Sequence, residues 1–298
     1  MSTVDHPIFP ESKATRVRGM RKRIKTSISS ALSALPGPVR EHVHRDLMQR
    51  RLSGIPLLRD NGKAFVGTFH KSGTVLLLKI ISSLCRRSNA RFWQKSVRPD
   101  EPDRWDVCFD WDADFSNKEG LTSQQAPTVL VIRDPRDIIV SGSYYHVKSE
   151  EGWLQVADER FAGKTYQEAI SALASAKDRF LFEMDHRGGE TIERILARLK
   201  DPVLFQAKVV RYETLVSADR LQAFFDMFRF LGVDEAYLPT ALEISIDNSL
   251  SQAKKQDASH VRSGAPRQWE TEFDDETRQA FEKRFPDALS IMGYDEPL

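Results

Sequence analysis

The chain has 298 residues, of which 40% are hydrophobic and 29% are charged, a composition typical of a globular protein with a buried core. The formal net charge is only +1, so no overall field attracts nucleic acid, and an anion site has to be built locally. No apolar run approaches the roughly 18 residues of a membrane span, and the polar N-terminus lacks a secretory apolar stretch. We therefore expect a cytoplasmic protein.

The two cysteines, Cys85 and Cys108, form neither a CxxC motif nor a metal-ligand spacing. We expect both to be small buried core residues in a reducing compartment. The seven histidines contain no HExxH pattern, so the sequence predicts no metal site.

The N-terminal region divides into residues 1–12, expected to be a disordered lead, and residues 13–38, which carry seven Lys and Arg residues. Apolar residues recur there every three or four positions, which predicts an amphipathic helix with a cationic face. It can pack on the rest of the chain, bind an anionic lipid surface or acidic partner through residues 13–35, or serve as an organellar transit segment. Residues 39–298 are expected to form one domain.

Three strand-to-helix units follow in chain order. A strand begins at Ala64 and leads through a loop to the helix TVLLLKIISSLC. A second strand, TVLVI, precedes a helix from Pro135 to about Tyr145, and a third, residues 208–212, precedes an amphipathic helix over 220–231. This alternation predicts an α/β three-layer sandwich with a mainly parallel central sheet, similar to the P-loop NTPase architecture.

Two further helical regions are predicted. Residues 166–199 read as a long helical stretch broken near Gly188 and Gly189. A final helix over 274–285 begins in an acidic turn, which suits the positive end of the helix dipole.

The loop after the first strand has the composition of a phosphate cradle. Lys71 supplies a charge, Ser72 and Thr74 supply hydroxyls, and Gly73 lets an anion approach the backbone at a helix N-terminus. It is not a Walker A motif, because Lys71 precedes Gly73 by two positions. An ordinary turn with an exposed lysine is the alternative.

A second anion site is predicted after the second strand. Arg133 stands at the carboxyl end of that strand, where ligands of parallel sheets bind, and its planar fork suits a phosphate. Ser141, eight residues on, can turn back to the same phosphate. The alternative for Arg133 is an ion pair with Asp134 or Asp137.

Four segments in order resemble the family of sulfotransferases that use 3′-phosphoadenosine 5′-phosphosulfate (PAPS), over about residues 64–295. The loop HKSGT looks like the family's 5′-phosphosulfate loop, PKSGTT, and RDPRDIIVSGSYYH looks like its 3′-phosphate motif. The segment RYETL resembles the family's YEDL, and HVRSGAPRQWETEF resembles its C-terminal RKGxxGxWKxxF loop.

The resemblance implies a role for each matching residue. Lys71 would contact the bridging oxygen of PAPS and stabilise the leaving nucleotide. The other implied binding residues are Ser72, Gly73 and Thr74 for the 5′-phosphate, Arg133, Ser141, Arg262 and Gly264 for the 3′-phosphate, and Tyr212 near the adenine. No metal is implied.

This sequence departs from the family pattern at several positions. His70 stands where the proline before the lysine is usual, Val75 replaces the second threonine, and Leu76 replaces the aromatic residue that stacks on adenine. In the late loop Ser263 replaces a common lysine.

The catalytic base is not found where relatives have a histidine, because residues 106–114 contain none. By position Asp110 is the first candidate and Asp112 the second, since burial can raise a carboxyl pKa enough for this work; a solvated acidic loop is the alternative. His70 is a further candidate, able to orient the sulfuryl group, and His146 is expected to be a packed residue at a helix end.

The predicted reaction is in-line transfer of a sulfuryl group from PAPS to the hydroxyl or amine of a small-molecule, sugar or lipid acceptor. An ATP-dependent P-loop kinase and a non-catalytic nucleotide-binding or membrane-surface adaptor are the alternatives. Variable loops, residues 86–125 and 146–190, are expected to build the acceptor pocket. Their tryptophans either line that pocket or belong to the core: Trp93, Trp105, Trp111 and Trp153.

Overall fold

The structure is a computed structural model, and it describes residues 52, 54–115, 126–204, 206–249 and 264–295. The chain divides into two units, Met1–Gly54 and Ile55–Leu298, and all helices and strands named below belong to the second. The predicted N-terminal lead and basic helix lie outside the described residues.

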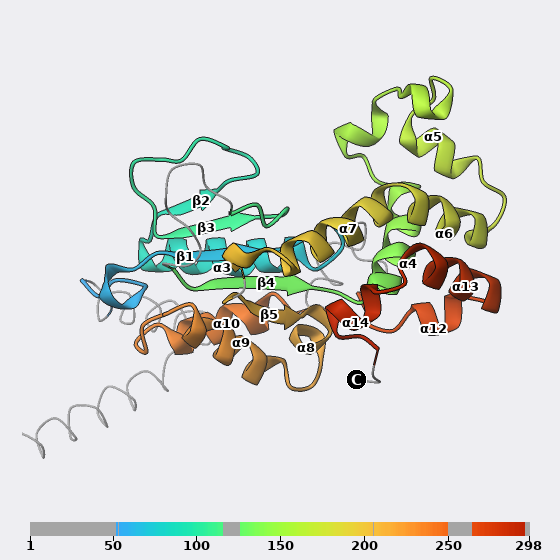
Figure 1. The fold of residues 1–298 in the computed structure, drawn as a ribbon. Helices are drawn as coiled ribbons and strands as arrows, with labels where there is room; N and C mark the ends of the chain where they lie inside the picture. Colours follow the sequence, from blue (N-terminus) through green and yellow to red (C-terminus); the bar gives the residue numbers. More distant parts are fainter. Residues whose placement is uncertain (1–51, 53, 116–125, 205, 250–263, 296–298) are drawn as a thin grey trace, which may run out of the picture. The chain divides into compact units, whose positions relative to one another are not determined.

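A five-stranded sheet in the order β2-β3-β1-β4-β5 forms the centre of the second unit, and every pairing in it is parallel (Figure 1). The prediction of a parallel sheet is confirmed. Strands β1, β3 and β4 are buried at every position, as expected when helices cover both faces. The strand bounds are Ala64–Gly67 (β1), Phe92–Gln94 (β2), Val107–Asp110 (β3), Thr128–Ile132 (β4) and Lys208–Arg211 (β5).

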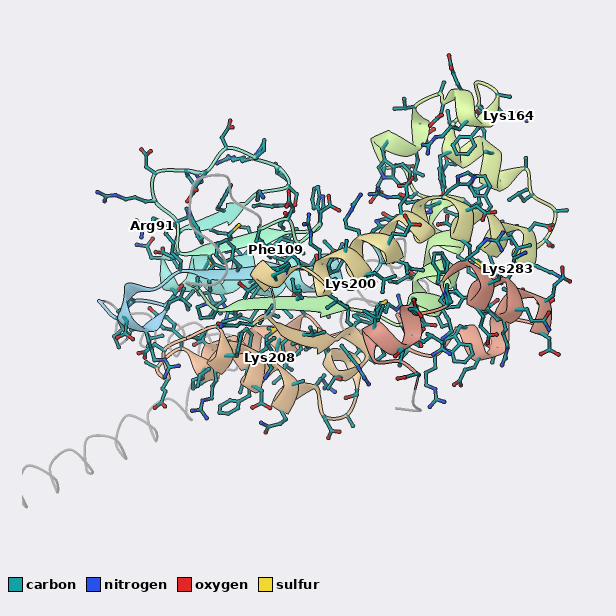
Figure 2. The ribbon with its side chains drawn as sticks, in the orientation of Figure 1. Arg91, Phe109, Lys164, Lys200, Lys208 and Lys283 are labelled. Carbon is teal, nitrogen blue, oxygen red and sulfur yellow. The ribbon has the colours of Figure 1, made fainter. Side chains whose placement is uncertain are left out.

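Helices cover the sheet on opposite faces, α3 (Thr74–Ser88) on one and α7 (Arg187–Leu199) on the other (Figure 1). Alternate strand residues point to opposite faces, and Phe65, Cys108 and Leu130 join Ile195 of α7 in one core cluster. Figure 2 places Phe109 inside the layers, where it is fully buried, and Arg91, Lys164 and Lys283 at the periphery. The three-layer arrangement is therefore confirmed.

The remaining helices follow β4 and β5. Asp134 caps α4 through the amide of Arg136, and Pro135 occupies its first position, where the missing N–H is harmless. After α9, Gly232 at φ 80° lets the amide of Val233 reach the carbonyl of Phe228, 3.0 Å away. The bounds are Pro135–His146 (α4), Tyr166–Ser171 (α5), Ala176–Asp185 (α6), Tyr212–Val216 (α8), Arg220–Phe230 (α9), Leu238–Asp247 (α10), Trp269–Glu272 (α12), Asp275–Arg284 (α13) and Ala288–Met292 (α14). Short 3-10 turns are η1 (Arg59–Asn61), η2 (Gly152–Gln155), η3 (Glu159–Phe161) and η4 (Pro202–Leu204).

The predicted helical region over 166–199 is broken close to the expected place, two residues before Gly188, and it has a further gap between α5 and α6 that was not predicted. The chain bends at His186, between α6 and α7, and both glycines lie inside α7. A Cβ on Gly189 would stand 2.1 Å from the Met184 carbonyl oxygen. The two glycines therefore allow α7 to approach the end of α6 closely.

Both cysteines are buried, as predicted, and burial raises the pKa of Cys85 to about 12.

The four tryptophans divide between the two interpretations. Trp93 and Trp105 belong to the core, whereas Trp111 and Trp153 are each 37% exposed. Among the helices that the structure describes, none is long and apolar enough to cross a membrane.

The close approach at Gly189 gives a stability test. We expect Gly189→Ala to lower the free energy of unfolding by about 1–3 kcal/mol, because the new methyl group meets backbone that cannot move aside. Gly152→Ala is the control, since a Cβ there meets nothing within 4 Å, and it should change stability by no more than about 0.5 kcal/mol. Urea denaturation measures both. Equal stability of the two variants would contradict the packing described.

Candidate active site

The loops after β1 and β4 meet at the carboxyl edge of the sheet. β1 and β4 are neighbours, but the chain leaves β1 toward β3 and β2 on one side and leaves β4 toward β5 on the other. In parallel α/β sheets a ligand crevice forms at such a switch point. The loop carrying Lys71 and the strand end carrying Arg133 flank this switch point, where such a crevice is expected.

The first loop has a backbone that only particular residues tolerate. Lys71 has φ 62° and Gly73 has φ 90°, and a Cβ on Gly73 would stand 2.7 Å from the ring of Tyr212. The first intrahelical bond of α3 runs from Leu77 N to Gly73 O, 3.0 Å, so the preceding amides have no partner within the helix. The Ser72 hydroxyl is buried with no hydrogen-bond partner among the described residues, a polar atom that a bound anion would satisfy.

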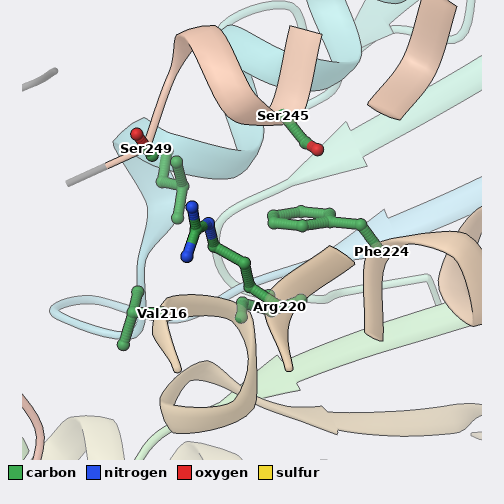
Figure 3. A pocket seen from close by; sticks show the side chains of 7 residues that line it. Val216, Arg220, Phe224, Ser245 and Ser249 are labelled. Carbon is green, nitrogen blue, oxygen red and sulfur yellow. The ribbon is translucent and has the colours of Figure 1, made fainter. Parts of the chain in front are cut away.

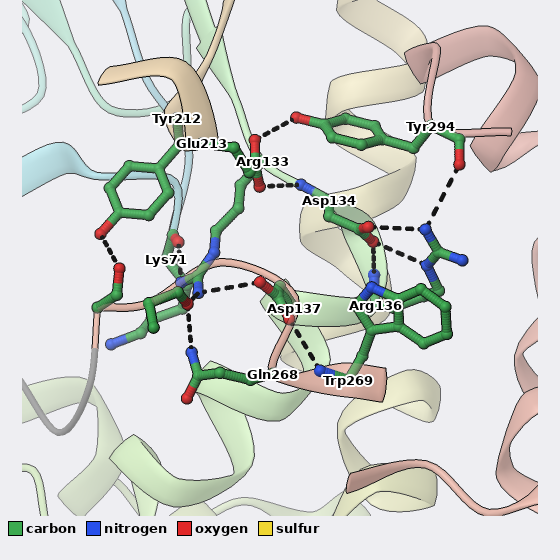
Figure 4. A network of polar contacts seen from close by, with 12 residues as sticks. Lys71, Arg133, Asp134, Arg136, Asp137, Tyr212, Glu213, Gln268, Trp269 and Tyr294 are labelled. Carbon is green, nitrogen blue, oxygen red and sulfur yellow. Dashed lines mark hydrogen bonds and ion pairs between the residues drawn. The ribbon is translucent and has the colours of Figure 1, made fainter. Parts of the chain in front are cut away.

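Arg133 connects the second strand end to this loop. Its guanidinium, 3% exposed, donates from Nη1 to the Lys71 carbonyl (3.2 Å) and from Nη2 to the Ala265 carbonyl (3.2 Å) (Figure 4). Nη2 also pairs with Asp137 at 3.4 Å, so the ion-pair alternative is correct for Asp137, while Asp134 pairs with Arg136. Lys71 and Arg133 therefore lie next to each other at the carboxyl edge of the sheet.

Tyr212 links three segments of the site. Its ring packs on Gly73 and lies 4.9 Å from the Arg133 guanidinium carbon. Its hydroxyl donates to the Gly264 carbonyl at 2.9 Å, which positions the start of the late loop. Arg262, predicted to join this site, lies outside the described residues.

A buried network behind the crevice was missed by the sequence analysis. The Glu213 carboxylate accepts from the Asp134 amide (3.0 Å) and from the Tyr294 hydroxyl (2.7 Å) (Figure 4). Burial raises the pKa of Glu213. Arg136 lies over the Trp269 ring at 3.6 Å. These contacts fix the turn next to Arg133, and the acidic residue in RYETL was the available signal for Glu213.

The Lys71 side chain lies over the ring of Tyr145, with Nζ 3.3 Å from the ring centroid. Burial, and then the positive charge of Arg133, lowers the pKa of Lys71 to about 7. Ser141 is half-buried on α4, and no described residue hydrogen-bonds its hydroxyl. A cation and a hydroxyl thus remain available to a ligand at this edge.

A cavity of about 250 Å³ adjoins the first loop (Figure 3). It opens beside Leu76, two residues beyond Thr74, and beside Leu215, three residues beyond Tyr212. The Arg220 Nε is buried and has no hydrogen-bond partner among the described residues. The walls are mostly apolar with one cation and two hydroxyls, from Leu76, Leu215, Val216, Arg220, Phe224, Ser245 and Ser249.

The two carboxylates predicted as bases, Asp110 and Asp112, both have protein partners at the end of β3. Asp110 is 3% exposed, and its oxygens accept from the Ser96 hydroxyl (2.5 Å) and the Asp114 amide (3.0 Å). Asp112 forms an ion pair with Arg194 of α7. Asp110 is therefore not a solvated loop residue, whereas the Asp112 side chain keeps 39% of its surface accessible beside Arg194.

His70 lies beside Lys71 and meets a second histidine. Its Nε2 is 2.9 Å from Nε2 of His146, the last residue of α4. His146 is fully buried, as predicted for a packed helix end, but its contact with the loop was not foreseen.

The loop geometry yields a binding test. We expect Gly73→Ala to weaken binding of adenosine 3′,5′-bisphosphate at least about tenfold, because the methyl group meets Tyr212 and the residue has φ 90°. Gly163→Ala is a matched control, with φ 79° and no atom within 4 Å of its Cβ. Isothermal titration calorimetry measures both affinities. If the two variants bind alike, the contact with Tyr212 is irrelevant to the cradle.

Comparison with known proteins gives a family match. The model of the sulfotransferase domain matches residues 116–293, which leaves the Lys71 loop outside the matched segment. No curated protein sequence matches the chain.

Two solved structures share the fold. The mouse sulfotransferase SULT7A1 complexed with PAP (adenosine 3′,5′-bisphosphate) has a TM-score of 0.52 at 16% identity, over 81% of this chain and 88% of that chain. Retinol dehydratase in complex with androsterone and the inactive cofactor PAP has a TM-score of 0.51 at 16% identity, over 84% and 87%. Because the domain model covers more than half of the 298 residues, the chain belongs to the sulfotransferase family.

Proposed function

We propose that this protein transfers a sulfuryl group from PAPS to a hydroxyl or amine of a small-molecule, sugar or lipid acceptor by in-line displacement. The observation that carries the proposal is the convergence of the two anion segments. Arg133 donates to the carbonyl of Lys71 across 3.2 Å, so one nucleotide with phosphates at both ribose ends can contact both.

The nucleotide fits the crevice group by group. The N-terminus of α3 and the buried Ser72 hydroxyl suit the 5′-phosphosulfate. Arg133, whose Nε has no described partner, and Ser141 suit the 3′-phosphate. The cavity beside Leu76 and Leu215 suits the adenine, because its walls are mostly apolar and Arg220 and two serines offer polar groups.

Lys71 is the residue placed to assist the leaving group. Negative charge grows on the bridging oxygen of the 5′-phosphate as its bond to sulfur breaks, and a nearby ammonium stabilises that charge most in the transition state. The lowered pKa of the free protein's Lys71 returns upward beside a phosphate, because an opposite charge favours the protonated form.

The acceptor enters from the side of the exposed aromatic residues. Trp111 and Trp153 each keep 37% of their surface accessible and offer apolar faces to a substrate. The steroid in the retinol dehydratase complex makes an apolar hydroxyl compound a reasonable first acceptor to test. Membrane contact through residues 13–35 and a cytoplasmic location stay predictions.

Sulfuryl transfer is tested with sulfur-labelled PAPS and a metabolite extract. We expect Lys71→Met to lower product formation by about 10²–10³-fold, as when one oxyanion-stabilising donor is removed. Lys148→Met is the control, because Lys148 is exposed at the end of α4, and it should keep wild-type turnover.

Binding assays separate the alternatives. A thermal shift with adenosine 3′,5′-bisphosphate and none with ATP plus Mg²⁺ is expected; the reverse pattern would support a kinase. Nucleotide binding without labelled product from any acceptor would support the adaptor. Full activity of Lys71→Met would refute the assignment of Lys71.

The pKa of Lys71 predicts a pH dependence of nucleotide binding. With a pKa of about 7 in the free protein and a higher one in the complex, binding takes up a proton above pH 7. The phosphates are fully ionised there, since their second pKa is about 6, so affinity for the bisphosphate should fall by up to about tenfold per pH unit. Calorimetry between pH 7 and 9 measures the slope, and Lys71→Met should abolish it. The same slope in that variant would assign the proton to another group.

A further inference from the structure

A line of hydrogen bonds leads from the transfer site into the interior. His70 Nε2 lies 2.9 Å from His146 Nε2, and His146 Nδ1 lies 2.5 Å from Glu183 Oε1. Tyr166 donates its hydroxyl to the same carboxylate oxygen at 3.0 Å. We call these residues the histidine relay: His70, His146, Glu183 and Tyr166.

The two imidazole rings meet edge to edge. Their planes differ by only 9° and their centroids are 5.0 Å apart, whereas the two Nε2 atoms are 2.9 Å apart. The nitrogens therefore lie between the rings, in the plane of both, where the lone pair of one faces the N–H of the other. This arrangement suits proton transfer, and it is not ring stacking.

The hydrogen bond to Glu183 indicates which nitrogens of His146 and His70 carry protons. A carboxylate accepts, so Nδ1 of His146 carries the proton that it donates to Glu183. When His146 carries a single proton, its Nε2 is the acceptor, and Nε2 of His70 donates to it. That leaves Nδ1 of His70 without a proton, so this nitrogen is the basic atom of the pair.

The two ends of the relay differ in solvent exposure. His146 and Glu183 are 0% exposed, whereas His70 is half-buried. Trp153 and Tyr166 pack edge-on against His146, with centroids 5.2 and 5.3 Å away. Only His70 can therefore meet an acceptor, and the inner residues are screened from water.

The Glu183 carboxylate fits at its position because a neighbouring residue, Gly142, has no side chain. A Cβ on Gly142 of α4 would stand 2.8 Å from Glu183 Oε2, so the glycine clears the space. Oε2 has no hydrogen-bond partner among the described residues, which makes the carboxylate costly as a purely structural group. The cost is offset when His146 becomes positive, because a neighbouring opposite charge stabilises it.

His70, the outer histidine of the relay, lies close to Lys71, the residue proposed to contact the leaving nucleotide. Lys71 Nζ lies 3.3 Å from the centroid of the Tyr145 ring, and the His70 ring centroid lies 6.2 Å from that of Tyr145. The two side chains thus flank one aromatic ring. Burial and neighbouring positive charges hold the pKa of His70 well below its ordinary value, so it is neutral at pH 7. The charged and titratable groups that act on it are His146, Lys71, Arg187 and Arg194, whereas Glu183 and Glu151 act on the neighbouring Lys71.

We propose that His70 is the general base of the transfer and that His146 and Glu183 are positioning residues: His146 takes up the displaced proton, and the Glu183 carboxylate stabilises the resulting charge. As the acceptor oxygen bonds to sulfur, its proton passes to Nδ1 of His70. The Nε2 proton of His70 moves to His146, which becomes an imidazolium paired with Glu183. The electron pair of the broken sulfur–oxygen bond stays on the 5′-phosphate beside Lys71. The inference rests on the proposed function for the reaction that it assists.

The relay itself is tested without turnover, by NMR of the full chain labelled with ¹⁵N-histidine. We expect Nδ1–H and unprotonated Nε2 in His146, with Nε2–H and unprotonated Nδ1 in His70. A strongly downfield proton shared by His146 and Glu183 should disappear in Glu183→Gln and persist in Glu193→Gln, whose carboxylate is exposed on α7. A protonated Nδ1 in His70 of the free protein at pH 7 would overturn the proposal.

Turnover with sulfur-labelled PAPS and substituted phenols as probe acceptors tests the base. We expect His70→Asn to lower kcat/KM for phenol by about 10²–10⁴-fold, and much less for a more acidic phenol that is already ionised. Glu183→Gln should lower kcat about tenfold and shift the acidic limb of the pH profile, while Glu193→Gln leaves both unchanged. Equal loss by His70→Asn with all phenols would indicate a structural role and overturn the proposal.

The failure of the two proposals can be told apart. Adenosine 3′,5′-bisphosphate affinity should be unchanged in Glu183→Gln at pH 6, where Lys71 is protonated in both proteins. If the wild-type protein binds no bisphosphate, the proposed function fails whatever the NMR spectra show. If it binds bisphosphate and transfers sulfuryl groups while the NMR tautomers differ from those expected, only the relay fails.

Discussion

The hydrogen bond from the Arg133 guanidinium to the Lys71 carbonyl is the constraint on which the site depends. It joins the ends of two adjacent strands, β1 and β4, across 3.2 Å. The same guanidinium reaches Ala265 of the late loop, and Tyr212 closes the arrangement by packing on Gly73 and donating to Gly264. Three segments far apart in sequence are thereby held against one crevice, which is the pre-organisation that transition-state stabilisation requires.

Placing several charges in this crevice has a consequence for their protonation. Lys71 lies close enough to Arg133 for burial and repulsion to bring its pKa to about 7, and His70 is kept neutral by the same surroundings. In the free protein, Lys71 therefore titrates near neutral pH next to an uncharged His70. Under the proposed function, a phosphate bound beside Lys71 would raise the pKa of its ammonium again, which would couple nucleotide binding to protonation of the lysine.

The family match and the geometry support different parts of the assignment. The sulfotransferase domain model begins at residue 116, so it covers Arg133, Ser141 and Tyr212 but not the loop with Lys71. The link between the two comes from the tertiary contacts, in which Arg133 and Tyr212 both touch that loop. The relay through His146 and Glu183 lies within the matched segment and yet ends on His70, outside it.

Local patterns in the sequence determined the elements that have enough residues to show a period or a cap. The strands at Ala64, Thr128 and Lys208, the helices after them, and the composition of the Lys71 loop were all predictable. Strands β2 and β3 were not predicted, because no described helix follows either of them and the strand-to-helix alternation is therefore missing there. The gap between α5 and α6 was not predicted either. The folded contacts alone reveal that Asp110 holds a turn and that His70, His146 and Glu183 follow one another in a line of hydrogen bonds. Those contacts join residues 76 and 37 positions apart, and local physical chemistry holds no information about pairings at that separation.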